Sequence, residues 1–316
     1  LVTLQDTIEA LESALAALAA GDGLNVPKAL GSLGEASSMH SLGSALPAAG
    51  YCGYKNWVNT PRGAKALFML FDAGQGRLLA MLEANVLGKL RTAAMTGLGT
   101  KWLAPAAARE LAIIGSGRQA LAQVAAVQAV RPLSAIRIWS PTADRRAAFA
   151  DEVRAHVAAD VRVCDSLPAA TEGAAIVTLV TRARQPFLSA GMLAPGAHLN
   201  AVGAILPANA EFHQDVFARA GLITVDDVAN TRKASREFIE YFDGGDGDWN
   251  RVRPLGAVIA GGAQALPADG DITLFKAMGM GISDLAVAIR AYEGAQAGGR
   301  GRDIALTDGA PLRWQR

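Results

Sequence analysis

Cysteine is scarce in this chain of 316 residues, which contains only Cys52 and Cys164. The two lie far apart in sequence, and neither has a second thiol or a histidine at metal-ligand spacing. That pattern excludes a disulfide framework and gives no indication of a zinc site, so we expect no bound metal. Reduced thiols are typical of proteins in a reducing compartment, and the expected location is therefore cytoplasmic.

Two further features are missing. The chain has no excess of one charge sign, because 30 basic side chains balance 29 acidic ones, whereas nucleic-acid binding requires concentrated positive charge. Its apolar stretches are interrupted well before the roughly 18 residues that a membrane-spanning helix needs, and no secretion signal opens the chain. We therefore expect a small-molecule partner, with neither nucleic acid nor membrane involved.

What is present is a hydrophobic chain long enough for two domains, with 51% hydrophobic residues. Residues 4–18 repeat apolar side chains at helical spacing, residues 26–82 consist of short apolar runs typical of a mostly antiparallel sheet, and residues 83–103 return to a helical composition. Pro105 interrupts that last helical stretch. We therefore place a domain boundary near Ala106.

Beyond this boundary, short apolar runs alternate with helical stretches. This alternation predicts an α/β fold with a Rossmann-type, doubly wound parallel sheet that is covered by helices on both faces. The predicted strands are residues 111–114, 135–139, 174–180, 196–202 and 222–225, and the predicted helices are residues 120–130, 144–158 and 282–297.

The strongest single motif is LAIIGSGRQA, residues 111–120. A buried strand leads into glycines whose missing Cβ atoms permit a tight turn and let backbone N–H groups approach a pyrophosphate at the start of the next helix. The strand before and the alanine-rich helix after favour dinucleotide binding over an ordinary strand-to-helix turn. The predicted phosphate-binding residues are Gly115, Ser116, Gly117, Arg118 and Gln119.

The end of the next strand bears on the choice of dinucleotide. NAD-preferring Rossmann domains carry a carboxylate there for the ribose 2′-OH, but this chain has Ser140 and Thr142, with Arg145 and Arg146 close behind. Hydroxyl and guanidinium groups suit a 2′-phosphate, so NADP(H) is favoured over NAD(H). The alternative is that Ser140 caps the following helix and the arginines are solvated surface residues.

Several segments together resemble the ornithine cyclodeaminase/mu-crystallin family, and they occur in the family's order. They are residues 53–55 (GYK), 78–104 (including RTAA), 115–120 (GSGRQA), 136–142 (IRIWSPT), 195–204 (PGAHLNAVGA) and 272–286 (ITLFKAMGMGISDLA). The RTAA and NAVGA segments are far more specific than any glycine-rich loop.

The resemblance implies a homodimer of two-domain subunits. Residues 1–106, completed by residues 285–316, would form an α+β substrate and dimerisation domain, and residues 107–284 the Rossmann dinucleotide-binding domain. A small amino or imino acid would bind between them. The shared chemistry of the family's reductases and dehydrogenases transfers hydride between such a substrate and the nicotinamide cofactor.

The resemblance also assigns site residues. Lys55 and Arg91 match positions that hold the substrate carboxylate, and both are predicted to be catalytic as well. Lys28 falls where the family usually has an arginine, and is predicted to bind substrate too. The predicted cofactor contacts are completed by Thr92, Thr181 and Val202.

Two positions at which members of the family carry a carboxylate need separate comment. Glu83 either accepts a proton or orients Lys55, or simply starts a helix. After NAVGA, cyclodeaminases of the family carry an aspartate for acid/base work, whereas this chain has Ile205, which we expect to be buried beside the nicotinamide. His198 is expected to be a strand residue and not a proton donor.

These residues favour an NADP(H)-dependent ketimine reductase, or the reverse amino-acid dehydrogenase, because reducing a preformed imine has less need of the missing base. One alternative is an ornithine cyclodeaminase, which converts ornithine to proline and ammonia. The other, suggested by Ile205 and Lys28, is an NADP(H)-binding protein without turnover.

Overall fold

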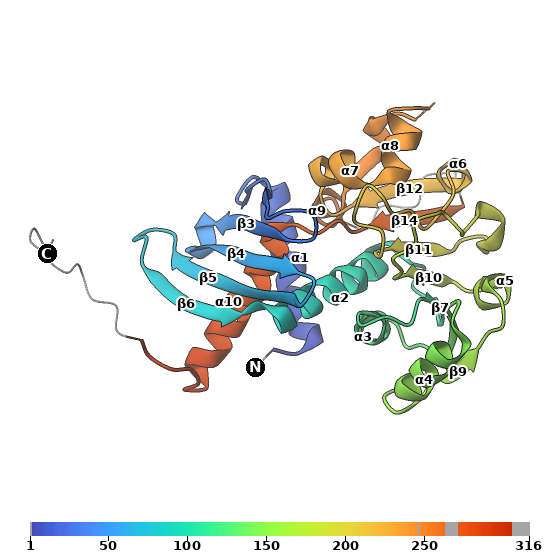
Figure 1. Cartoon of the computed structure of the whole chain (residues 1–316), viewed down its shortest axis with the longest axis horizontal. Coiled ribbons are helices and arrows are strands. Elements are labelled where there is room, and N and C mark those ends of the chain that lie inside the picture. The colour runs from blue at the N-terminus through green and yellow to red at the C-terminus, as the bar shows by residue number, and fades with distance from the viewer. Residues whose placement is uncertain (1, 246, 263–270, 305–316) are drawn as a thin grey trace, which may run out of the picture.

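The computed structural model describes residues 2–245, 247–262 and 271–304. An antiparallel sheet and a parallel sheet lie side by side, and one long helix, α2, runs between them (Figure 1). Both kinds of sheet were predicted from the sequence, and both are confirmed. The end of the predicted first domain, residues 305–316, and residues 263–270 of the predicted Rossmann domain lie outside the described residues.

The antiparallel sheet comes from the first part of the chain, and the third to sixth of its strands form a continuous meander. Its strands are β1 (Leu24–Asn25), β2 (Ala29–Ser32), β3 (Ser38–Leu46), β4 (Tyr51–Thr60), β5 (Gly63–Asp72) and β6 (Leu78–Glu83), and the short helix η1 (Pro47–Ala49) joins β3 to β4. They are ordered β1-β3-β4-β5-β6, and β2 pairs with β3.

Helices cover one face of this sheet. They are α1 (Leu4–Ala19), α2 (Ala84–Leu103) and α10 (Gly281–Ala297), and α10 crosses β3, β4 and β5. Thr3 begins α1 through a capping box with Asp6, in which each side chain accepts a backbone N–H from the other residue. Phe68 and Leu70 of β5 point into the core below, where both are fully buried. Helix α10, the last helix of the described residues, therefore packs on this sheet together with α1 and α2.

The parallel sheet has eight strands in the order β13-β12-β14-β11-β10-β7-β8-β9. They are β7 (Glu110–Ile114), β8 (Ala135–Trp139), β9 (Asp160–Val163), β10 (Ile176–Leu179), β11 (His198–Ala201), β12 (Ala220–Val225), β13 (Val252–Pro254) and β14 (Ile272–Lys276). Chain order reverses between β7 and β10, which is the position where doubly wound sheets bind ligands beyond their carboxyl ends.

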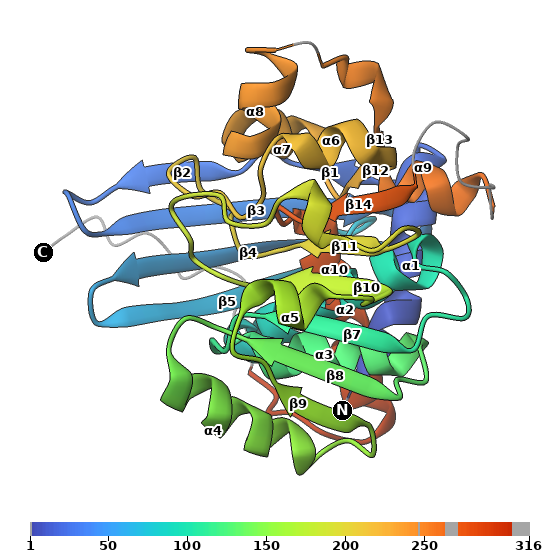
Figure 2. The same ribbon diagram turned by 90° about the vertical axis from the view of Figure 1, so that its right-hand side faces the viewer.

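Helices lie on both faces of this sheet, as predicted (Figure 2). They are α3 (Ala120–Val130), α4 (Ala143–Arg154), α5 (Leu167–Thr171), α6 (Asp215–Arg219), α7 (Val228–Ala234), α8 (Arg236–Phe242) and α9 (Leu255–Ala260), with short turns η2 (Ala190–Met192) and η3 (Trp249–Arg251).

Strand β7 shows why the sheet needs helices on both of its faces. Leu111 and Ile113 join the core cluster that includes α3 and α4, while Ala112 and Ile114 join the cluster on the opposite face. Successive strand residues point to opposite faces, so a strand that is apolar at every position must be covered twice.

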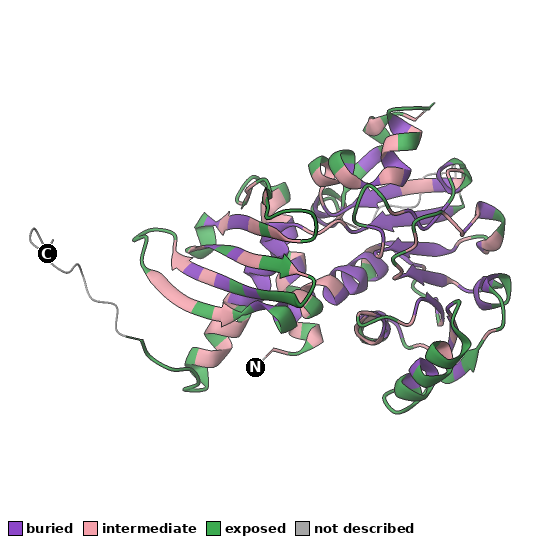
Figure 3. Cartoon of the chain, in the orientation of Figure 1, coloured by how far each residue is buried: buried purple, intermediate pink, exposed green. Residues whose placement is uncertain are grey.

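Helix α2 belongs to both halves of the molecule. Its second half, from Ala93 to Thr100, is buried without interruption, and the helix contacts β5 and α10 on one side and α3, β11 and β14 on the other. Figure 3 shows this buried segment continuing into the buried strands of the parallel sheet. A helical segment that is buried on all sides lies in the protein interior. Residues on α2 are thus held rigidly relative to both sheets.

Candidate active site

A buried ion pair lies at the centre of the first half of the molecule. Lys55 lies on the face of β4 that α10 covers, and its Nζ donates a 2.8 Å hydrogen bond to Oδ1 of Asp284. Asp284, in the first turn of α10, is fully buried, and Lys55 is nearly so. Burial is the main reason why the pKa of Lys55 is lowered to about 8, with the positive charge of Arg91 adding to the effect and Asp284 opposing it.

Arg91 from α2 approaches the same carboxylate. Its Nε lies 3.4 Å from Oδ1 of Asp284, and its side chain remains partly exposed. The Nη1 and Nη2 groups form the other end of the guanidinium fork, which is the part that binds a carboxylate in bidentate fashion. The structure therefore brings together Lys55 and Arg91, the two predicted carboxylate-binding residues, around an acidic residue that we had not singled out.

Lys28 and Trp57 extend this cationic site. The Nζ of Lys28 lies 5.3 Å from the centre of the Trp57 ring, and the Nζ of Lys55 lies 5.1 Å from it, both distances that permit cation–π attraction. The ring of His40 stacks on Trp57 with centres 4.5 Å apart. Desolvation, followed by the charges of Arg91 and Lys233, lowers the pKa of Lys28. Lys28 thus reaches the site, while Trp57 forms part of its wall.

The loop before α10 joins this site to the parallel sheet. A Cβ atom added to Gly279, which has a φ of +90°, would lie 3.0 Å from Nη1 of Arg91. Asp226, at the carboxyl end of β12, accepts hydrogen bonds from the backbone N–H groups of Met278 and Gly279. Burial raises the pKa of Asp226 to about 6. The cations therefore lie beside the edge of the parallel sheet where Rossmann folds bind their ligands.

The glycine turn after β7 fits the phosphates of a dinucleotide. Gly115 has a φ of +117°, and a Cβ atom there would come within 2.8 Å of the carbonyl oxygen of Val180, so the tight turn requires glycine. A Cβ atom on Gly117 would meet no protein atom within 4 Å, which leaves its backbone open to a ligand. Gln119 caps α3 without a side-chain hydrogen bond, so its own side chain does not occupy the first N–H groups of that helix.

The side chains predicted to bind a 2′-phosphate differ in whether they already form hydrogen bonds within the protein. Ser140 is buried, and its hydroxyl shares a 3.0 Å hydrogen bond with that of Ser116. Thr142, not Ser140, is the N-cap residue of α4, and its hydroxyl makes no capping hydrogen bond. Arg145 in the first turn of α4 is exposed, as is Arg118 in the glycine turn. The alternative in which Ser140 caps the helix is therefore wrong.

The ends of β10 and β11 carry Thr181 and Val202, which lie at the same edge of the sheet. Glu211, a fully buried residue that we had not singled out, accepts hydrogen bonds from the backbone N–H and the hydroxyl of Thr181 at 2.7 and 2.8 Å. It also accepts N–H groups from Gly203 at 2.9 Å and Ala204 at 3.0 Å. This carboxylate ties together two loops beside the expected nicotinamide position.

The structure describes the surroundings of four other residues that the sequence analysis named. Glu83 begins α2 by accepting the N–H groups of Asn85 and Val86, so its ordinary role at a helix start is the observed one. His198 lies buried in β11, as expected, and burial lowers its pKa to about 4. Thr92 follows Arg91 on α2, where its hydroxyl donates to the carbonyl of Gly88 at 2.8 Å.

The fourth of these residues, Ile205, requires a correction. Ile205 was expected to be buried, but 47% of it is exposed. It belongs to the loop beyond β11, at the carboxyl edge of the parallel sheet. A polar or charged side chain at this position would therefore lose little hydration in the free protein.

Sequence signals for the two missed carboxylates exist but are weak. Asp284 stands in the first turn of a helix, where acidic residues are common for reasons of helix stability alone. Glu211 is a single carboxylate between apolar residues, and only its contacts across the fold reveal what it binds.

Neither a metal site nor a membrane span is found in the described part of the chain. Within the described residues, no group of three or more histidine, cysteine, aspartate or glutamate side chains is placed to hold a metal ion. Over the same part of the chain, no helix is long and apolar enough to cross a membrane.

These features define a class of protein. A Rossmann-type sheet with an open glycine turn, next to a cluster of cationic side chains, is the arrangement of a dinucleotide-dependent oxidoreductase. More specifically, the chain belongs to the ornithine cyclodeaminase/mu-crystallin family, whose model matches residues 2–299.

Curated relatives support this membership. The ketimine reductase mu-crystallin of Rattus norvegicus is 33% identical over 248 residues, which cover 78% of this chain and 74% of that protein. A Delta(1)-pyrroline-2-carboxylate reductase of Bacillus cereus is 31% identical over 239 residues, covering 75% of this chain and 73% of that protein.

Solved structures share the whole architecture. The Delta(1)-pyrroline-2-carboxylate reductase of Thermococcus litoralis, in complex with NADH and L-proline, has a TM-score of 0.89 at 26% identity, and the match covers 96% of this chain and 97% of that one. An archaeal alanine dehydrogenase dimer with bound NAD also has a TM-score of 0.89 at 26% identity, covering 97% and 96%.

Proposed function

We propose that this protein is a nicotinamide-dependent reductase of the C=N bond in a small ketimine that carries a carboxylate, or the dehydrogenase that runs the same reaction in reverse. The observation that carries the proposal is the place of Gly279, which joins the two parts of the site. Its loop lies against Arg91 on one side and is held by Asp226 at the carboxyl edge of the parallel sheet on the other.

In this proposal Arg91 and Lys55 bind the carboxylate of the substrate. The guanidinium fork of Arg91 supplies two parallel N–H donors, and the ammonium of Lys55 supplies a point charge. Lys28 adds positive charge at the exposed side of the site. Trp57 gives the substrate an apolar wall, held in place by its stacking with His40.

Reduction of an imine also requires a proton on nitrogen. A bound nicotinamide supplies the hydride that reaches the imine carbon. Lys55, with its pKa lowered to about 8, is the candidate donor of the proton to nitrogen, because a lysine in this range both holds and releases a proton near neutral pH. Its catalytic role therefore rests on its pKa as well as on its position.

The proposed cofactor is NADP(H) in preference to NAD(H). Gly115, Ser116, Gly117, Arg118 and Gln119 would hold the pyrophosphate, and Thr92, Thr181 and Val202 would lie toward the nicotinamide. The unengaged hydroxyl of Thr142 and the exposed guanidinium of Arg145 support a 2′-phosphate site. Ser140 would act indirectly, by holding the hydroxyl of Ser116 in place through their shared hydrogen bond.

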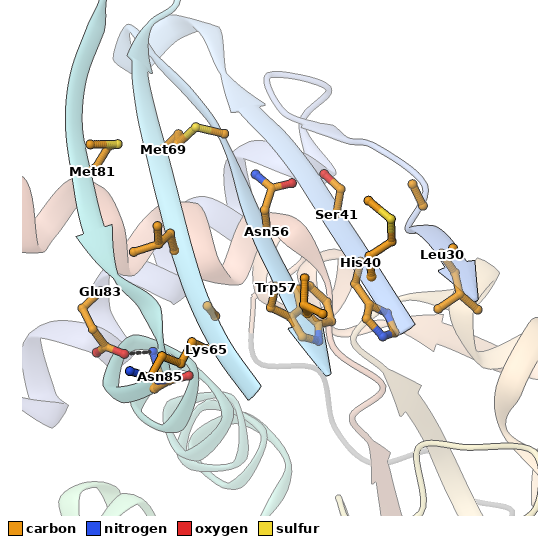
Figure 4. A pocket seen from close by; sticks show the side chains of 16 residues that line it. Leu30, His40, Ser41, Asn56, Trp57, Lys65, Met69, Met81, Glu83 and Asn85 are labelled. Atoms are coloured by element: carbon orange, nitrogen blue, oxygen red, sulfur yellow. Dashed lines mark hydrogen bonds between the residues drawn. The ribbon is translucent and has the colours of Figure 1, made fainter. Parts of the chain in front are cut away.

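We also propose the predicted domains, a substrate and dimerisation domain of residues 1–106 with 285–316 and a Rossmann domain of residues 107–284, and a homodimer. The outer face of the antiparallel sheet supports the dimer (Figure 4), because exposed apolar side chains line a hollow there that no helix of this chain covers within the described residues. They are Met39, Val58, Leu67 and Met81.

A cytoplasmic location belongs to the same proposal, since both cysteines are free thiols.

A panel of three assays tests the proposed function against its alternatives. NADPH oxidation with cyclic ketimines would support the reductase. Proline and ammonia formed from ornithine, without net change in the cofactor, would instead identify an ornithine cyclodeaminase. Tight NADPH binding with neither activity would identify a binding protein without turnover.

A further inference from the structure

We propose that Asp284 is a positioning residue of the substrate site, whose buried carboxylate fixes Lys55 and Arg91 in the orientation that receives the substrate carboxylate. The inference rests on the proposed function, because it concerns the same site. It goes further in assigning a role to an acidic residue that touches neither the substrate nor the cofactor directly.

Three separate elements meet at Asp284. Lys55 comes from β4, Arg91 from α2 and Asp284 from the first turn of α10, and Oδ1 of Asp284 is 2.8 Å from Nζ of Lys55 and 3.4 Å from Nε of Arg91. The carboxylate has no exposed surface. A buried charge is retained only where partners compensate it, and here both partners are side chains predicted to bind substrate.

The contact with Arg91 determines which part of the guanidinium is available. The contact is an ion pair without a hydrogen bond, since the buried Nε–H has no acceptor in hydrogen-bonding geometry, and Nη1 and Nη2, which make no hydrogen bond to the described residues, are left for a second carboxylate in bidentate geometry. The Arg91 side chain is partly exposed while Asp284 is not, so the available end points toward the open side of the site.

The contact with Lys55 keeps an ammonium group in a place that disfavours it. Desolvation and the charges of Arg91 and Lys28 all lower the pKa of Lys55, while Asp284 raises it. Beyond these groups, Lys233 acts on Lys28, and the buried Asp226 faces Arg91. Among the described residues, Asp284 is the one carboxylate in contact with Lys55.

The start of α10 is anchored so that this carboxylate cannot move away. The N–H of Ile282 donates to Oδ1 of Asn25, and the hydroxyl of Ser283 donates to the carbonyl of Met280. A Cβ atom on Gly281 would collide with the backbone of Gly43 in β3, so the helix approaches the sheet as closely as glycine allows. The first turn of a helix also favours a negative charge.

The test compares Asp284→Asn with the wild type in the full chain. The variant keeps the shape of the side chain and removes its charge, and Glu293→Gln on the exposed part of the same helix is the matched control. We would measure kcat and KM for a cyclic ketimine from pH 6 to 10, NADPH affinity, and the affinity for cyclopentanecarboxylate, a carboxylate probe that cannot react.

For the wild type, kcat/KM and probe affinity should fall as pH rises through about 8, because the ammonium form of Lys55 binds the carboxylate. We call this decrease at high pH the alkaline limb of the pH profile. In Asp284→Asn the limb should move to lower pH by about one unit or more, since an adjacent opposite charge no longer favours the ammonium form of Lys55. KM and the probe dissociation constant should rise about tenfold or more at pH 7.5, with NADPH affinity unchanged.

An unchanged pH limb and unchanged probe affinity would overturn the inference, as would a uniform loss of NADPH binding and thermal stability without a shift of the limb. If Asp284→Asn does not fold, Asp284→Glu decides: an alkaline limb near that of the wild type with weaker probe binding supports the inference, and unaltered probe binding contradicts it. Probe binding needs no turnover, so its result stands apart from the failure of the proposed reaction.

Discussion

Gly203 lies against the backbone of Thr181 so closely that a Cβ atom on Gly203 would overlap both the N and the O atoms of Thr181. These residues follow neighbouring strands, β11 and β10, and Glu211 binds the N–H groups of both. The absence of a side chain at position 203 therefore lets one buried carboxylate hold the two loops together at the expected nicotinamide position.

Gly203→Ala should separate these loops. We expect NADPH affinity to fall about tenfold, because overpacking of a close contact costs on the order of 1–3 kcal/mol. Affinity for the 2′-phospho-ADP-ribose fragment, which lacks the nicotinamide, should change much less. Calorimetric titration of both ligands measures the difference.

Gly191→Ala is the control for that experiment, since a Cβ atom there meets nothing within 4 Å. Equal losses for NADPH and for the fragment in Gly203→Ala would show that the loops do not serve the nicotinamide half.

Arg145→Ala and Thr142→Ala should each narrow the preference for NADPH over NADH. Removing a charge-assisted contact to the 2′-phosphate costs about 1.5–3 kcal/mol, so we expect NADPH to bind roughly tenfold or more weakly, with little change for NADH. Arg154→Ala, at the other end of α4, is the matched control. Equal affinities for the two cofactors in the wild type would contradict the assignment.

Ile205→Asp should add an acid/base group at the position where the family's cyclodeaminases carry one. Because 47% of Ile205 is exposed, an aspartate there should stay ionised at neutral pH. General acid/base catalysis typically contributes about 10²–10⁴-fold, so we expect gained or increased turnover of ornithine or alanine. Steady-state rates on ornithine, alanine and a cyclic ketimine provide the comparison.

The wild type should handle preformed imines and turn over ornithine poorly. Ornithine turnover by the wild type at rates normal for an enzyme would refute the claim that Ile205 excludes this chemistry.

The outer face of the antiparallel sheet should hold two copies together. Light scattering should then give twice the chain mass of 32.7 kDa, and Met81→Lys or Leu67→Glu should shift the protein toward the monomer by placing a charge in an apolar contact. Val163→Lys, an exposed apolar residue on β9, is the control. A wild-type monomer at micromolar concentration would contradict this dimer.

Local patterns were sufficient to predict most of the fold. The alternation of apolar runs with helical stretches predicted β7, β8, α3 and α10 to within two residues, because strands buried on both faces and Ala-rich helices have distinct composition. The role of β14 between β11 and β12 was not predicted, since strand order depends on packing over long sequence distances.

The site was predicted less completely. Lys55 and Arg91 were found through the family resemblance, and the structure places them together. Asp284 and Glu211 were missed because their partners are distant in sequence, 229 residues away for Lys55 and 30 for Thr181. The burial expected of Ile205 was wrong because the residue lies in a loop beyond the sheet, and the apolar character of one residue does not reveal how far such a loop is covered.

The most direct test of the proposed function follows the hydrogen that NADPH transfers to the substrate. The protein would be incubated with NADPH that carries deuterium at both C4 positions of the nicotinamide, so that a deuteride is transferred from either face, and with a cyclic ketimine such as Δ1-pyrroline-2-carboxylate. Mass spectrometry of the amino-acid product should find one deuterium on the carbon that bears the carboxylate for each NADPH oxidised by the wild type, and at most trace product with Lys55→Met. Oxidation of NADPH without deuterium in the product, or no oxidation with any ketimine tried, would contradict the account.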